Sequence, residues 1–219
     1  MYFAKIPNYA QQLYPGYRWK ISTEKKELYL TFDDGPTPQI SDWVRTELAK
    51  YNAKATFFVL GRQVEAHSDI VHRLLDEGHT LGNHSQTHVN GWKVSLFRYL
   101  LEFKRAQKAI KHFTGAKTLL FRPPYGKISA KQASFIQRSH QIVMMDVMPG
   151  DFDNRIDKEE CLDRAIKHSE PGSVICLHDS VKAWPHLEYV LPRFLEHFSN
   201  KGYRFKALNP IPEQLQVIH

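Results

Sequence analysis

The chain of 219 residues is long enough for one large domain or two small ones. Its hydrophobic content of 42% and aromatic content of 12% suffice for a sizeable core and exclude a wholly disordered chain. The formal net charge of +7 favours anionic partners or surfaces and says nothing about the fold. No run approaches the roughly 18 apolar residues of a membrane-spanning helix, so none is predicted.

The cysteine content and the first residues bear on the cellular compartment. Only Cys161 and Cys176 are present, which excludes a disulfide framework and a cysteine-based zinc module. Residues 1–20 lack the continuous apolar run of a signal peptide. A reducing, cytoplasmic location is therefore expected, unless export is directed by another route.

Along the chain, short β-branched or aromatic runs alternate with longer amphipathic stretches. Strands are predicted over 27–32, 54–60, 79–84, 118–122, 141–147, 173–178 and 203–208. Helices are predicted over 37–50, Ser68 to Gly78, Ser95 to Gly115, after the caps Ser129 and Asp157, and over about 186–200. No repeat or linker divides the chain. We expect one catalytic domain over 27–219, with an N-terminal extension over 1–26 packed on it.

The alternation of seven strands with helices predicts an α/β fold with parallel strands. An open doubly wound sheet is one alternative. A (β/α) barrel with outer helices is favoured because polar residues gather where several strands end, as they do at the catalytic face of such barrels. Seven strands would make it smaller than the eight-stranded form.

Two adjacent carboxylates, Asp33 and Asp34, follow the apolar strand LYLTF and precede Gly35-Pro36. Regular strand residues would face opposite sides of the sheet, so the two converge only because the chain leaves the strand at this turn. A solvated turn is the alternative interpretation. Their significance depends on partners elsewhere in the chain.

His84 and His88 supply such partners directly after a predicted strand. On a helical turn, two imidazoles four residues apart share one face and can bind one ion. An aspartate with two histidines leaves one coordination position for water, as in a catalytic zinc site. The alternative is that, among 12 histidines, two lie four residues apart by chance and bind no metal.

Three further strand ends carry polar groups. His178 ends the run SVICL, where a buried core histidine is the alternative. The segment RPPYG at 122–126 has two prolines, which remove two backbone N–H donors and leave the Tyr125 amide as a rigid donor beyond them. The alternative is a structural turn in which Arg122 forms an ordinary ion pair. Asp146 and Asp151 close the fifth strand, where a helix cap or a surface charge is the alternative.

Five segments of the chain resemble, in order and spacing, the five motifs of one enzyme family. They are TFDDGP at 31–36, HSQTH at 84–88, RPPYG at 122–126, the Asp151 segment and LH at 177–178. That family is the polysaccharide deacetylases, carbohydrate esterase family 4, with the NodB-type homology domain. The resemblance covers about 31 to 178, most of the chain. It implies a distorted seven-stranded (β/α) barrel.

The resemblance also implies a role for each matched residue. One divalent metal ion would be bound by Asp34, His84 and His88, most often zinc, with cobalt, nickel or manganese as alternatives. Asp33 would be the general base, held in place by Arg122. The Tyr125 backbone amide would stabilise the oxyanion. His178 would be the general acid, and Asp151 would orient His178 and tune its pKa.

The fourth motif departs from the family pattern. It usually ends Asp-Trp, whereas this segment reads DVMPGDF at 146–152. We match Asp151 to the family aspartate and Phe152 to its tryptophan, with Asp146 as the competing match. Phe152 and Leu177 are expected to wall an acetyl pocket, although phenylalanine lacks the indole N–H donor.

The resemblance predicts a metal-dependent hydrolase that removes N-acetyl groups from sugars by metal-activated water. The expected partner is an N-acetylated oligo- or polysaccharide, such as peptidoglycan or a chitin-like glycan. The alternatives are an O-acetyl esterase, a non-sugar amide or imide hydrolase, and a non-catalytic glycan-binding protein. We expect a monomer, and no motif supports nucleic-acid binding.

Surface features give weaker indications about the partner. Trp92 and Trp184 follow two of the motifs, and each is interpreted as a sugar-stacking or a structural tryptophan. The predicted helix over 95–117 carries six basic residues against Glu102 alone. Its apolar stripe should face inward and its basic flank outward. That flank is either a solvated face or attracted to an anionic cell-wall polymer or a membrane surface.

Overall fold

The computed structural model describes residues 2–210. The predicted domain extends to residue 219, and residues 211–219, like Met1, lie outside the described residues. No helix within 2–210 combines the length and the apolar character needed to cross a bilayer.

Seven strands form one parallel sheet, which confirms the predicted α/β class. They are β1 (Glu27–Asp33), β2 (Thr56–Val59), β3 (Thr80–Asn83), β4 (Leu120–Phe121), β5 (Gln141–Ile142), β6 (Val174–His178) and β7 (Arg204–Phe205). The order is β5-β4-β3-β2-β1-β6, and β7 pairs with the start of β1. The sheet is not closed: within residues 2–210, the two edges are joined only by an isolated bridge, from Val147 to Ile175. The fold is therefore a distorted barrel rather than a regular one.

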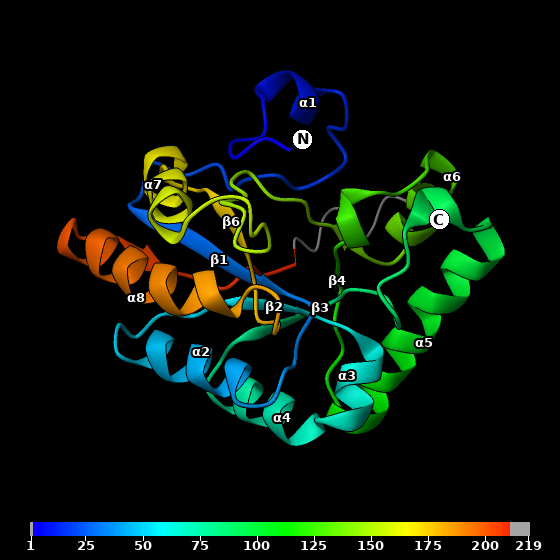
Figure 1. Ribbon diagram of the computed structural model, residues 1–219. Helices are drawn as coiled ribbons and strands as arrows, with labels where there is room; N and C mark the ends of the chain where they lie inside the picture. Colours follow the sequence, from blue (N-terminus) through cyan, green and yellow to red (C-terminus); the bar gives the residue numbers. More distant parts are fainter. Residues whose placement is uncertain (1, 211–219) are drawn as a thin grey trace.

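Helices surround the strands on most sides (Figure 1). They are α1 (Asn8–Gln12), α2 (Ile40–Ala49), α3 (Gly61–Ala66), α4 (Ser68–Asp76), α5 (Leu96–Thr114), α6 (Ala130–Gln137), α7 (Lys158–His168) and α8 (Trp184–Asn200), with 3-10 turns η1 (Gly91–Lys93) and η2 (Pro124–Gly126). The side chains of Ser95, Ser129 and Asp157 accept hydrogen bonds from the first turns of α5, α6 and α7, as predicted. The short helices α1 and α3 were not predicted, because five or six residues are too few to show a helical period.

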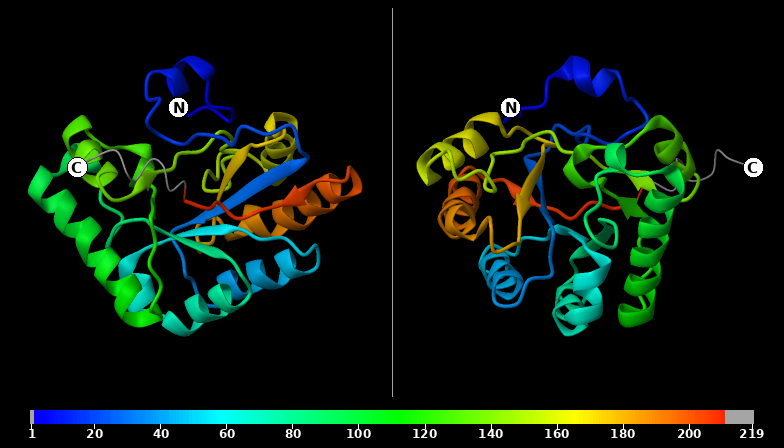
Figure 2. Two further views of the ribbon diagram at one scale, coloured as in Figure 1. Left: turned by 180° about the vertical axis from the view of Figure 1, so that it is seen from behind. Right: turned by 45° about the vertical axis from the view of Figure 1, so that its right-hand side comes forward.

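The N-terminal segment before β1 lies across the gap between β5 and β6 (Figure 2). The Arg18 N–H donates to the Ile142 carbonyl over 2.8 Å, and the Arg18 carbonyl accepts from Met144 N–H over 2.8 Å. Lys20 forms a backbone bridge with Ser173. The segment thus supplies hydrogen-bond partners to the edge strands that the open sheet leaves free.

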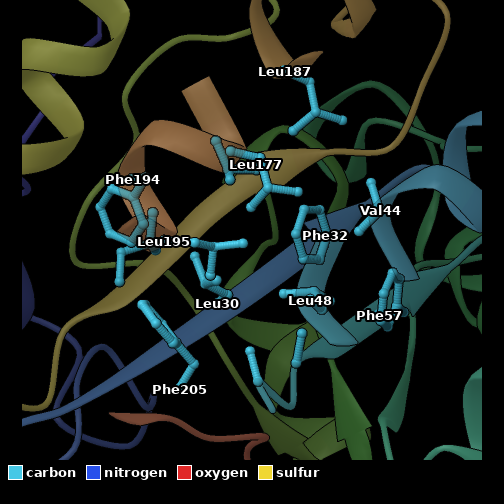
Figure 3. Packing of buried hydrophobic residues seen from close by; sticks show 14 of the residues in the cluster. Leu30, Phe32, Val44, Leu48, Phe57, Leu177, Leu187, Phe194, Leu195 and Phe205 are labelled. Carbon is cyan, nitrogen blue, oxygen red and sulfur yellow. The ribbon is translucent and has the colours of Figure 1, made fainter. Parts of the chain in front are cut away.

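Successive side chains along the central strands point alternately to the apolar core beneath the helices and to the interior of the barrel. Leu30 and Phe32 of β1 join Leu177 of β6 in the apolar layer beneath α2 and α8 (Figure 3). Thr31 and Asp33, the alternate residues of β1, therefore point to the opposite side. Polar side chains can then meet inside the barrel without interrupting its apolar outer layer.

Candidate active site and metal centre

The candidate residues meet at the carboxyl ends of the parallel strands. Asp33 at the end of β1 is in register with His178 at the end of β6. His84 directly follows β3, and Arg122 directly follows β4. Because all these strands are parallel, their last residues share one edge of the sheet, which is the usual catalytic face of such a barrel.

Asp34, His84 and His88 form a compact set of metal donors. Asp34 Oδ1 lies 3.2 Å from His88 Nε2 and 3.7 Å from His84 Nε2, and one ligand atom from each of the three residues lies within 4.8 Å of the others. Asp34 Oδ1 is buried and has no hydrogen-bond partner among residues 2–210. This unsatisfied oxygen beside two imidazole nitrogens fits a divalent cation.

The backbone around the donors orients them toward one point. His84 Nδ1 lies 2.8 Å from the Arg122 carbonyl, so that nitrogen carries the proton and Nε2 is left for a metal. Burial, followed by the adjacent His84, lowers the pKa of His88. A neutral imidazole is the form that binds a metal.

The prediction that the two histidines lie on a helical turn is wrong. They lie in a loop after β3, where Ser85 has φ 68° and His88 has φ 61°. The Asn83 side chain accepts from the Ser85 N–H, and the Ser85 hydroxyl accepts from the His88 N–H. These side-chain bonds to the backbone compete with helix formation, and the loop brings both rings to Asp34 instead.

Asp33 is paired with Arg122. Arg122 Nη1 donates to Asp33 Oδ1 over 2.8 Å, and both side chains are buried. The guanidinium also donates to Thr31 Oγ1 and to the Met144 carbonyl, and it lies 4.2 Å from the centre of the Phe58 ring. Burial alone would raise the pKa of Asp33, but Arg122 and neighbouring histidines more than offset it and lower that pKa. The carboxylate is therefore ionised and held in one orientation.

His178 is paired with Asp151 and not with Asp146. Its Nδ1 lies 2.9 Å from Asp151 Oδ1, and its backbone N–H donates to Asp151 Oδ2 over 2.7 Å. Burial alone would lower the pKa of His178, but Asp151 and the more distant carboxylates outweigh it and raise that pKa to about 9. Asp146 instead binds Lys5 Nζ at 2.7 Å and the Ser173 hydroxyl at 2.6 Å.

Phe152 and Leu177, the expected pocket walls, lie in different places. The Phe152 ring packs against the His178 ring with centres 5.2 Å apart. Leu177 does not line the site: it is 1% exposed and belongs to the core beneath the helices (Figure 3). Strand alternation turns Cys176 to the site in its place, with Sγ 3.4 Å from Asp33 Oδ2. Burial and then the Asp33 charge raise the pKa of Cys176 well above its ordinary value, so the thiol stays protonated and donates.

Tyr125 and the two tryptophans differ in how much of each is accessible. The Tyr125 N–H, at φ 60°, donates to no acceptor among residues 2–210, and the Tyr125 ring lies 4.4 Å from the His88 ring. Trp92 is 68% exposed, whereas Trp184 is partly buried and packs edge-on against Trp43 at the margin of the core. The free amide and the exposed ring are both available to a bound molecule.

The sequence reasoning missed Asp179, which fixes the turn that carries Asp34. Asp179 is buried and accepts from the Gly35 N–H over 3.1 Å and from the Ser41 hydroxyl. A Cβ on Gly35 would lie 2.0 Å from Asp179 Oδ2, so only glycine fits this turn. Thr31 and Cys176 were also missed, although the period of two along β1 and β6 places both on the side of Asp33 and His178.

Comparisons with known proteins identify the family. The family description "Polysaccharide deacetylase" matches residues 20–143. A peptidoglycan-N-acetylglucosamine deacetylase of Bacillus cereus is 30% identical over 206 residues, which cover 88% of this chain and 91% of that protein. The peptidoglycan-N-acetylmuramic acid deacetylase PdaC of Bacillus subtilis is 30% identical over 193 residues, covering 88% of this chain but only 40% of PdaC.

The fold similarity extends over nearly the whole chain. The crystal structure of a peptidoglycan N-acetylglucosamine deacetylase in complex with 4-naphthalen-1-yl-N-oxidanyl-benzamide has a TM-score of 0.85 and 28% sequence identity. The match covers 97% of this chain and 98% of that one. With the family match spanning more than half of the sequence, the chain belongs to the polysaccharide deacetylases, carbohydrate esterase family 4.

Proposed function

We propose that this protein is a metal-dependent N-deacetylase that hydrolyses the acetamido groups of an N-acetylated glycan, with peptidoglycan as the natural class. The observation that carries the proposal is the meeting of three groups at one edge of the sheet. These are the Asp34–His84–His88 donor set, the Asp33–Arg122 pair and the His178–Asp151 pair. The names of the relatives support the glycan as substrate.

Asp34, His84 and His88 would hold the metal, zinc first among the candidates. A bound divalent ion supplies Lewis acidity, which makes water more acidic and an acetyl carbonyl more electrophilic. The charge of Asp33 and its fixed contact with Arg122 suit it to accept a proton from the attacking water. The hydroxide oxygen then bonds to the acetyl carbon.

The opposite side of the site completes the hydrolysis. The Tyr125 N–H is free to donate to the carbonyl oxygen as negative charge develops there. One ligand atom each of Asp33, Cys176 and His178 lies within 4.8 Å of the others, so the acid faces the base across a short gap. His178 donates a proton to the sugar nitrogen while the carbon–nitrogen bond breaks, giving acetate and a free amine.

The paired histidine favours an amide over an ester. An amine leaves only when it is protonated, whereas an alcohol needs less help, so a strongly held proton donor matters most for amide cleavage. Asp151 contributes both a hydrogen bond and a charge to keep His178 protonated. O-acetyl esterase action is the alternative that the substrate test identifies directly, whereas a non-sugar amide hydrolase would release acetate from neither sugar.

The test is acetate release from a short N-acetylglucosamine oligomer, measured with zinc supplied and again after a chelator. We expect release with zinc and its loss with the chelator, restored by added zinc. Release from an O-acetylated sugar alone would identify an esterase. Absence of release from both, with metal bound, would contradict the proposal.

The metal site has a test of its own. His84→Ala should lose bound zinc, because only two protein donors would remain. His112→Ala, at an exposed position on α5, is the matched control and should keep it. Zinc content is measured by elemental analysis after dialysis. Equal zinc in both variants would show that these three residues are not the ligands.

A further inference from the structure

The charge of the molecule is distributed very unevenly. Residues 93–145 contain 11 lysines and arginines and one acidic residue, Glu102. The remainder of the sequence contains 19 basic and 22 acidic residues. The whole positive excess therefore comes from the part of the chain that forms α5, α6 and the loops around them.

Most of these cations have no carboxylate partner. Within residues 2–210, only Arg98 and Arg122 of this segment form ion pairs, with Glu102 and Asp33. Elsewhere the structure pairs most of its arginines with carboxylates, as with Arg73 and Asp42 at 2.9 Å. The positive charge on the α5 side is thus not neutralised within the described part of the chain.

The cations follow one stripe along α5. Phe97, Leu101, Lys104, Lys108 and Lys111 recur at the spacing of one helical face, and all five are exposed. The opposite face of α5 is buried in the protein. Phe97 is 79% exposed and Leu101 is 37% exposed, so the basic stripe begins with an apolar pair. Figure 1 shows α5 along the outer edge of the molecule.

The basic stripe continues onto α6. Lys104 Nζ lies 5.7 Å from the centre of the Phe135 ring, and Arg138 lies 5.3 Å from the same ring. The two helices therefore present one continuous surface, in which aromatic rings lie among the cations. We call this surface the α5–α6 basic surface and define it by Phe97, Leu101, Lys104, Lys108, Lys111 and Arg138.

We propose that the α5–α6 basic surface binds an anionic lipid bilayer. Lysines and arginines on a helix are attracted to anionic headgroups, and exposed apolar side chains on the same face enter the boundary between headgroups and acyl chains. Phe97 and Leu101 favour lipid over a soluble polyanion, which offers no apolar layer for them. None of these residues lies among the candidate catalytic or metal-binding residues, so lipid binding is independent of the proposed reaction.

The test measures co-sedimentation of the full chain with vesicles of phosphatidylcholine alone or with 30% phosphatidylglycerol. We expect binding only to the anionic vesicles, weakening as salt is added. Lys104→Glu/Lys108→Glu/Lys111→Glu should weaken it by at least about 100-fold, since the loss of each cation near such a surface costs about fivefold and each added glutamate is repelled by the anionic headgroups. The control variant is Lys25→Glu/Lys201→Glu/Lys206→Glu, whose three positions are exposed and lie outside this surface. It changes the net charge by the same amount, and it should bind the anionic vesicles more tightly than the variant of α5.

Phe97→Ser distinguishes binding to a lipid bilayer from binding to a soluble anionic polymer. It should weaken vesicle binding while leaving all the cations in place, and it should hardly change binding to long-chain polyphosphate. Loss of vesicle binding in both triple variants to the same extent would show that only net charge matters and would overturn the proposal. Unchanged vesicle binding in Phe97→Ser, with equally tight polyphosphate binding, would assign the surface to a polyanion instead. Unfolding temperatures confirm that each variant is folded.

Discussion

Two neighbouring carboxylates acquire different properties from their surroundings. Asp33 ends β1, points into the barrel and is held by the buried Arg122 guanidinium. Asp34, at φ 80°, has left the strand and turns an oxygen without hydrogen-bond partners toward the two histidines. One suits a proton acceptor and the other a metal ligand. Different environments around like groups are the usual way in which one site obtains two functions.

Asp33→Asn tests this separation. The amide cannot accept a proton, so turnover should fall about 10²- to 10⁴-fold, the range typical of general base catalysis. Zinc content should be unchanged because Asp34, His84 and His88 remain. Asp34→Asn is the matched variant and should lose zinc. Acetate release and elemental analysis are the measurements, and near-normal turnover in Asp33→Asn would remove the base assignment.

The paired charges also predict the pH dependence of kcat/KM. Because Arg122 and the neighbouring histidines lower the pKa of Asp33, protonation of this carboxylate should not limit activity until the pH falls below the ordinary aspartate range. Because Asp151 raises the pKa of His178 to about 9, the acid is lost as the pH rises through that value. Asp151→Asn should therefore move the alkaline limb to lower pH, toward the ordinary histidine pKa of about 6.5.

Asp163→Asn, at an exposed position on α7, is the control for this shift. It removes one negative charge without touching His178, so its alkaline limb should match that of the original protein. An alkaline limb that stays in place in Asp151→Asn would show that another group titrates there.

At the scale of elements, alternation within a strand decides which side chains reach the site. In β6, Ile175 and Leu177 lie in the apolar layer under the helices, while Cys176 and His178 lie beside Asp33. The register of β6 with β1 fixes this arrangement, because a shift of one residue would exchange the two faces. Leu177 is thus a core residue, and Cys176 is the side chain adjacent to the base.

Leu177→Ala and Cys176→Ala should separate these roles. Leu177→Ala removes buried apolar volume and should lower the free energy of unfolding by about 2–5 kcal/mol, with kcat/KM of the folded protein little changed. Cys176→Ala removes the thiol donor to Asp33 and should lower kcat/KM by about three- to tenfold, the effect of one ordinary hydrogen bond. Urea unfolding and steady-state kinetics are the measurements. A larger catalytic loss in Leu177→Ala would return Leu177 to the pocket.

At the scale of the whole molecule, the N-terminal segment contributes to a sheet that does not close by itself. Its backbone pairs with residues near β5 and β6, and Lys5 reaches the buried Asp146 at 2.7 Å. Asp146 is also bound by the Ser173 hydroxyl, so a segment at the start of the chain is joined to the two edges of the sheet. The extension is therefore part of the folded structure of the catalytic region.

Lys5→Ala should be markedly destabilising for this reason. It leaves the buried Asp146 carboxylate without its cation, at a cost of about 2 kcal/mol, between the values of exposed and fully buried pairs. Lys20→Ala is the matched control, since Lys20 and Glu170 are both exposed and 3.5 Å apart, and it should change little. Thermal unfolding measures both. Equal effects would show that the contact with Asp146 contributes no more than a surface pair.

Local patterns in the sequence determined the elements and the chemical content of the site. Seven strands and six of the helices follow from apolar periodicity and from caps such as Ser95, Ser129 and Asp157, which depend on residues only a few positions apart. The candidate metal donors and the residues beside them follow from motifs within a few residues of strand ends. Family membership follows from the same short motifs.

Only the tertiary structure decided the contacts between residues far apart in the chain. Whether Asp146 or Asp151 pairs with His178 depends on how the long loop after β5 folds back over β6. The pairing of the N-terminal segment with both edges of the sheet and the continuity of basic residues from α5 to α6 depend likewise on packing. The physical reason is that periodicity and capping are set by neighbours in sequence, whereas pairing across the barrel depends on three-dimensional arrangement, which one sequence does not display.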